Sequence, residues 1–154
     1  MEEAKNIFLI LDELRENAKQ VDNDGLKAVE TLITEANRIF IGGAGRSGFC
    51  ARGFSNRLMH LGYTVYFVGE PTTPSIQAGD LLIVGSGSGN TASLVSNVKK
   101  AKDQGAKVAT LTMFPENKIG SMADAIIKIP GVTEKCADQN EGGSVQASGS
   151  SFEE

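Results

Sequence analysis

The sequence predicts an α/β fold in which a parallel sheet is covered by helices on both faces. Short, nearly continuous apolar runs recur along the chain, as in residues 39–41 and 81–84. Segments with the three- and four-residue apolar spacing of helices separate these runs. Glycine-rich turns follow two of them, at residues 42–48 and 85–91. Strands that are apolar along their whole length are typical of parallel sheets buried on both sides.

Two helices are expected before the first strand. Apolar residues recur at helical steps through residues 1–20, with acidic residues early and Arg15 and Lys19 late, which predicts an amphipathic helix that packs on another surface. One of the polar residues at 22–24 can cap a second helix that reaches about Ala36. Its expected inner face consists of Leu26, Val29, Leu32 and Ile33.

Five strands and two further helices account for most of the remaining chain. The strands are expected at residues 38–42, 63–68, 80–84, 107–112 and 125–129. The helices are expected at residues 49–61 and from residue 92 to about 104, where Gly105 ends the second. Residues 113–123 read as a loop with one helical turn. Right-handed crossovers place the carboxyl ends of all strands on one edge of the sheet, where ligands bind in such folds.

The turn at residues 85–91, Gly-Ser-Gly-Ser-Gly-Asn-Thr, lies between a strand and a helix start and is here named the hydroxyl loop. Unpaired backbone N–H groups and the positive end of the helix dipole make such a turn an anion site. Ser86, Ser88 and Thr91 add hydroxyl donors, but the loop lacks the lysine of a nucleotide-triphosphate P-loop. A single phosphate ester is therefore the expected ligand. The alternative is a plain turn in which Thr91 or Ser88 only caps the helix.

The turn at residues 42–48, here named the first glycine loop, supports a competing interpretation. Residues 43–48 satisfy the GxGxxG pattern, and Glu70 follows about twenty residues later, as in a dinucleotide-binding fingerprint. Three features argue against this interpretation: two helices precede the first strand, a second anion loop follows a neighbouring strand, and the chain is too short for a separate substrate domain. Arg46 is a rigid donor fork suited to phosphate or sugar oxygens, although it could also be a solvent-exposed charge.

The composition excludes several classes of protein. A formal net charge of −4 argues against nucleic acid as a partner, because such proteins carry a basic patch. Cys50 and Cys136 lack metal-ligand spacing, which predicts reduced thiols and no metal site. No apolar run approaches a membrane span, and no signal peptide is evident. We expect a soluble, cytoplasmic protein.

The C-terminal part of the chain has no periodicity. Residues 131–149 are polar and glycine-rich, which fits either a mobile linker or a loop that orders over a ligand. Residues 150–154 resemble the first turn of a helix. We expect residues 1–154 to form one domain with two leading helices, and the helix that begins near residue 150 to be truncated.

Three motifs together resemble the 6-phospho-3-hexuloisomerase family of the sugar isomerase (SIS) domain superfamily. They are Gly-Gly-Ala-Gly-Arg-Ser-Gly at 42–48, Arg-Leu-Met-His-Leu-Gly at 57–62 and the hydroxyl loop at 85–91. The resemblance implies a flavodoxin-like three-layer sandwich with a five-stranded parallel sheet. It also implies a homotetramer and interconversion of 3-hexulose 6-phosphate with fructose 6-phosphate in formaldehyde fixation through the ribulose monophosphate pathway. No metal or organic cofactor is implied.

The resemblance also implies which residues bind and react. The substrate phosphate is expected on the hydroxyl loop, with help from the first glycine loop. The implied binding residues are Gly45, Arg46, Ser47, Ser86, Gly87, Ser88, Asn90 and Thr91. The family's C-terminal motif Gln-Pro-Met-Gly-Ser-Leu-Phe-Glu-Gln aligns with residues 146–154, which makes Glu153 the implied base. This chain has Ala147, Ser148 and Ser151 in place of proline, methionine and leucine, which removes packing contacts.

The implied reaction needs a base to move a proton between neighbouring carbons and an acid or dipole to stabilise an enediolate. Glu153 is the first candidate for the base, and Glu70 is the second. His60 is the single histidine and could shuttle a proton between sugar oxygens. It lies too far along its helix to reach the first glycine loop of its own chain, so related SIS domains suggest a neighbouring subunit's site. The alternative is a structural or exposed histidine.

Two other functions remain open from the sequence. A phosphosugar-binding regulatory module would bind the same sugar phosphate without reaction. An oxidoreductase domain would bind NAD in a manner that depends on Gly45 and Glu70.

Overall fold

Five parallel strands form one sheet in the computed structural model, which describes residues 4–140 and 143–153. The strand order is β2-β1-β3-β4-β5. The strands are β1 (Ile39–Gly43), β2 (Val65–Phe67), β3 (Leu81–Gly85), β4 (Lys107–Thr112) and β5 (Ala125–Lys128). This order is the flavodoxin-like one, in which the chain direction across the sheet reverses between β1 and β3. The predicted fold class is therefore confirmed.

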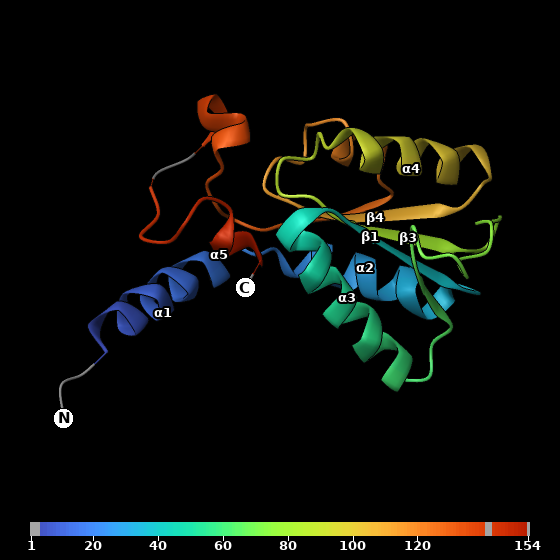
Figure 1. The fold of residues 1–154 in the computed structure, drawn as a ribbon, viewed down its shortest axis with the longest axis horizontal. Coiled ribbons are helices and arrows are strands. Elements are labelled where there is room, and N and C mark those ends of the chain that lie inside the picture. The colour runs from blue at the N-terminus through green and yellow to red at the C-terminus, as the bar shows by residue number, and fades with distance from the viewer. Residues whose placement is uncertain (1–3, 141–142, 154) are drawn as a thin grey trace.

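Helices cover both faces of the sheet, which makes three layers (Figure 1). Helices α2 (Asn23–Glu35) and α3 (Gly45–His60) lie on one face, and α4 (Ala92–Asp103) and the short η1 (Gly120–Met122) lie on the other. Neighbouring residues of β1 point to opposite faces of the sheet. Ile41 packs in the cluster with α2 and α3, whereas Phe40 packs with α4. Two-sided burial explains why the strands are apolar throughout.

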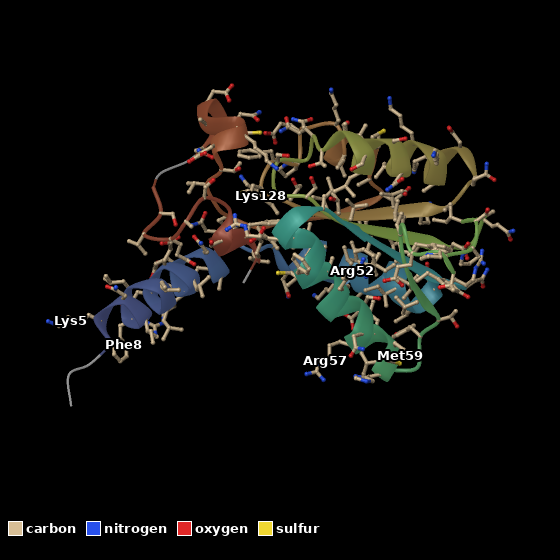
Figure 2. All side chains as sticks on the ribbon, viewed as in Figure 1. Lys5, Phe8, Arg52, Arg57, Met59 and Lys128 are labelled. Carbon is tan, nitrogen blue, oxygen red and sulfur yellow. The ribbon has the colours of Figure 1, made fainter. Side chains whose placement is uncertain are left out.

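The leading helix α1 (Lys5–Ala18) extends away from the sheet (Figure 1). None of its residues is buried, and Phe8 points outward from it (Figure 2). The predicted helix is confirmed from Lys5 onward. Its apolar face does not pack against a core in the part of the chain that the structure describes. The expected first residues, 1–3, and the last, 154, lie outside the described residues.

The second helix follows its predicted signals closely. The Asp22 side chain caps α2 by accepting hydrogen bonds from the backbone N–H groups of Asp24 and Gly25, at 3.2 and 3.0 Å. Val29 is buried as expected, whereas Leu26 is 43% exposed. The expectation that Leu26 lies on the inner face was wrong, because that residue is in the first turn, at the margin of the packed surface.

Helix α3 begins at Gly45, four residues before the predicted start at residue 49. The first glycine loop is thus mostly the first turn of α3. A Cβ on Gly43 would lie 2.9 Å from the Cα of Gly48, so these glycines allow β1 and α3 to pack closely. Gly45 has a φ of +59°, which glycine adopts without strain. The sequence placed this helix start too late because glycine is a poor helix former.

The C-terminal segment folds back over the carboxyl edge of the sheet. It contains the 3-10 turns η2 (Glu134–Gln139) and the short helix α5 (Ser150–Glu153), which is the predicted first helical turn. Phe152 anchors α5, since it is 8% exposed and packs in a cluster with Met113, Phe114 and Cys136. Within the described ranges, no helix combines the length and apolar character that a bilayer span requires.

Candidate functional site

The first glycine loop and the hydroxyl loop meet at the point where the strand order reverses. Gly43 at the end of β1 and Gly85 at the end of β3 are register partners on neighbouring strands. The two turns therefore leave the sheet side by side. In open parallel sheets this switch point is the place where ligands bind.

The hydroxyl loop leaves its side chains available to a ligand. Ser86 is 3% exposed, and its Oγ has no hydrogen-bond partner in the part of the chain that the structure describes. Thr91 is the N-cap residue of α4, yet its side chain makes no capping hydrogen bond. Ser88 is also buried, and its Oγ accepts only a long hydrogen bond of 3.4 Å from the N–H of Asn90. The alternative of a plain side-chain cap by Thr91 is therefore not what the structure shows.

Neighbouring segments contact the carbonyl groups of the hydroxyl loop and hold it in place. The Gly87 carbonyl accepts from the Met113 N–H at 3.1 Å. The Ser88 carbonyl accepts from Asn117 Nδ2 at 2.9 Å and lies 3.9 Å from Cys136 Sγ. Burial raises the pKa of the Cys136 thiol, as do the nearby carboxylates Asp138 and Glu116, so the thiol stays protonated and donates. These contacts hold the hydroxyl loop in place before any ligand arrives.

Gly87 leaves room for two neighbouring side chains. A Cβ there would lie 2.6 Å from Met113 Cε and 3.4 Å from Phe152 Cδ1. The end of the Met113 side chain would have to shift, whereas Phe152 of α5 would be in ordinary contact with the added Cβ.

Glu153 lies beside the first glycine loop, at the end of α5. Ser47 Oγ donates to its Oε1 at 2.9 Å, and Arg46 Nε is 3.4 Å from its Oε2. The Glu153 side chain is only 14% exposed. Arg46 also donates to the carbonyl of Ser148 and, at 3.4 Å, to Ser150 Oγ. Arg46 thus ties the C-terminal segment to the start of α3, although the arginine side chain itself is 57% exposed.

A cavity of about 230 Å³ lies between these elements. The hydroxyl loop, the first turn of α3, η2 and α5 all contribute to its walls. Of the predicted residues, the cavity brings together Gly45, Arg46, Ser47, Ser86, Gly87, Ser88, Thr91 and Glu153. Glu153 also lines a more apolar cavity, together with Cys50, Phe54 and Leu111. The carboxylate therefore stands at the boundary between a polar and an apolar space.

Three other predicted residues lie elsewhere. Asn90 does not line the cavity, and its Oδ1 accepts a hydrogen bond from the Lys118 N–H at 3.3 Å. Glu70 pairs with Arg52 beside a different surface hollow. His60 is the last residue of α3 and is exposed. Figure 2 shows its neighbours Arg57 and Met59 at the end of α3 that points away from α5.

Sequence reasoning missed the contribution of the segment at 131–140. Thr133, Glu134 and Lys135 line the same cavity, and Cys136 packs behind the hydroxyl loop. Because this segment has no periodicity, only its polar composition hinted at such a role. The interpretation as a loop that orders over a ligand stays a prediction. Among the described residues, no three histidine, cysteine or acidic side chains gather as a metal site.

Comparison with known proteins identifies the family. Residues 32–152 match the family model described as SIS domain. The chain belongs to the SIS domain family. The match begins within α2, so the assignment of all residues from 1 to 154 to a single SIS domain with two leading helices stays a prediction.

This chain is similar to proteins that are named 3-hexulose-6-phosphate isomerase. It is 42% identical to the one from Bacillus subtilis (strain 168), over 100% of this chain and 83% of that protein. It is 40% identical to the one from Mycobacterium gastri, over 98% of this chain and 75% of that protein. A crystal structure from Methanococcus jannaschii, for which this molecular function was inferred, matches with 37% identity and a TM-score of 0.72. That match covers 97% of this chain and 77% of the other.

Proposed function

We propose that this SIS domain interconverts 3-hexulose 6-phosphate and fructose 6-phosphate, in the ribulose monophosphate pathway of formaldehyde assimilation. The observation that carries the proposal is that the unpartnered Ser86 hydroxyl and the Glu153 carboxylate line one cavity. The same cavity thus offers donors to a phosphate and a carboxylate that can act as a base. The names of the similar proteins from Bacillus subtilis and Mycobacterium gastri support this substrate pair.

The phosphate is assigned to the hydroxyl loop. Ser86, Ser88 and Thr91 offer hydroxyl groups there, and the unpaired N–H groups at the start of α4 point to the same place. Gly87 and Gly45 let the backbone approach the ligand. Asn90 holds the loop through Lys118 rather than through the ligand.

The carbonyl end of the sugar is assigned to Glu153. In the direction toward fructose 6-phosphate, the carboxylate takes the proton from C2, the C2–C3 enediolate forms, and the proton returns to C3. The hydroxyl proton on O2 moves to O3 in the same step sequence, so the product carries its carbonyl at C2. Arg46 and Ser47 keep Glu153 in place, and Arg46 also offers positive charge near the enediolate oxygens.

Exchange of deuterium into the sugar tests this function. With fructose 6-phosphate in D₂O and no added cofactor, the protein is expected to introduce deuterium at C3, which NMR spectroscopy locates. Exchange at C1 would instead indicate a different ketose isomerase. Binding of fructose 6-phosphate by calorimetry without any exchange would favour the regulatory module. Saturable NAD binding without sugar-phosphate binding would favour the oxidoreductase, but Glu70 is engaged with Arg52 outside the cavity.

We also propose that the chain forms a homotetramer with sites shared between subunits. The exposed apolar residues of α1 support association, since contiguous apolar surface is costly to leave in water. They are Ile7 (57% exposed), Phe8 (54%), Leu9 (54%) and Leu11 (49%). His60 is exposed at the outer end of α3, and in this proposal it acts in another subunit's cavity. Both cysteines are unpaired, which supports a reducing, cytoplasmic location that cell fractionation would test.

Subunit mixing tests the shared site. His60→Asn and Glu153→Gln chains are each expected to be inactive alone, because one lacks the proton shuttle and the other the base. Co-expressed, they are expected to recover part of the wild-type activity, since some cavities then combine an intact Glu153 with a neighbour's intact His60. The assay is deuterium exchange at C3, with light scattering to give the mass of the assembly. A fully active His60→Asn protein or a monomeric wild-type chain would contradict the proposal.

A further inference from the structure

Lys135 lies on η2 at the wall of the cavity that the hydroxyl loop lines. Its position is set by its neighbours. Cys136, the next residue, is 6% exposed and places its Sγ 3.9 Å from the Ser88 carbonyl. Asn117 joins the same carbonyl to the other end of η2, since its Nδ2 is 3.2 Å from Gln139 Oε1. Lys135 is therefore carried by a turn that is docked on the hydroxyl loop.

Four charged side chains from the described residues line this cavity. Arg46 and Glu153 interact with each other at 3.4 Å, and Arg46 is further engaged by Ser148. Glu134 is the second acid, and Lys135 is the second cation. Among the described residues, the Lys135 ammonium takes part in neither an ion pair nor a hydrogen bond. It is the cation in this wall that remains available to a ligand.

The hydroxyl loop by itself is poorly matched to a doubly charged group. Its hydroxyl and N–H donors are dipoles, and the helix terminus contributes only about half an elementary charge. A phosphate monoester carries close to two negative charges at neutral pH. P-loops meet this need with a lysine in the loop itself, and the hydroxyl loop has none. A lysine delivered from another segment would serve the same purpose.

We propose that Lys135 is the cationic contact of the phosphate held on the hydroxyl loop, and that it makes the site selective for a dianionic ester. This inference rests on the proposed function, because it takes a sugar phosphate as the ligand. It assigns to the aperiodic segment at 131–140 a binding role that its composition does not reveal. It also separates the two cations of the cavity, with Lys135 at the phosphate end and Arg46 at Glu153.

The test compares two esters of the same shape and different charge. Fructose 6-phosphate is a dianion at pH 7.5, whereas fructose 6-sulfate is a monoanion. Calorimetry measures the dissociation constants of both for the wild type, Lys135→Met and Lys135→Arg, with the exposed Lys99→Met as matched control. Lys135→Met is expected to weaken phosphate binding about tenfold. The same variant is expected to lose less affinity for the sulfate ester, and its kcat is expected to change less than its KM. Lys135→Arg is expected to retain most of the selectivity for the phosphate ester.

Several outcomes would overturn the proposal. One such outcome is that Lys135→Met leaves the ratio of the two dissociation constants unchanged while the wild type binds normally. That result would exclude the role of Lys135, but it would not contradict the proposed function. An equal loss for both esters, accompanied by a lower melting temperature and no rescue by arginine, would show a structural role instead. A wild-type protein that binds neither ester would overturn this inference together with the proposed function.

Discussion

Glu153→Gln is expected to lower kcat for isomerisation by about a thousandfold while leaving the affinity for fructose 6-phosphate nearly unchanged. The amide has the shape of the carboxylate and can still accept a hydrogen bond from Ser47 Oγ and lie beside Arg46. It cannot accept a proton from carbon, so the first step of the reaction fails. Deuterium exchange at C3 measures the chemical step, and calorimetry measures binding.

Glu134→Gln is the matched control for this variant. Glu134 is a second acid in the wall of the same cavity, but its backbone N–H contacts Ser148 Oγ and its side chain has no part in the proposed reaction. Its substitution removes the same charge and is expected to change kcat only slightly. If Glu153→Gln retained near-wild-type exchange, Glu153 would not be the base.

Ser86→Ala is expected to have opposite effects on stability and on binding. The Ser86 hydroxyl is buried and has no hydrogen-bond partner among the described residues, so its removal is expected to raise the free energy of unfolding by about 1 kcal/mol. The same hydroxyl is assigned to the phosphate, and hydrogen bonds to charged groups contribute more than neutral ones. Affinity for fructose 6-phosphate is therefore expected to fall roughly tenfold or more.

Thermal unfolding with and without ligand reports both effects in one experiment. Ser86→Ala should melt above the wild type in buffer and show a smaller rise in melting temperature when fructose 6-phosphate is added. Ser93→Ala changes an exposed serine in the first turn of α4 and should leave both quantities unchanged. A variant that is less stable than the wild type and binds the ligand normally would mean that Ser86 Oγ serves the fold rather than the site.

Local patterns in the sequence determined the fold class and most of the elements. Apolar runs and the helical spacing between them are properties of neighbouring residues, and these located all five strands to within a few residues. A cap at residues 22–24, which the structure shows to be Asp22, and a stop at Gly105, whose φ is +75°, follow from the chemistry of neighbouring residues. The hydroxyl loop was identified for the same reason, since its residues are contiguous and lie between β3 and α4.

Contacts between distant segments were decided only by the tertiary structure. Nothing local shows that Ser47 donates to Glu153, more than a hundred residues later, or that Arg46 holds Ser148. The cavity exists because β1 and β3 are neighbours and because the C-terminal segment folds back over their carboxyl ends. Lys135 enters the site through the packing of Cys136 on the Ser88 carbonyl. Such contacts depend on the register of the sheet and on burial, which no periodicity along the chain encodes.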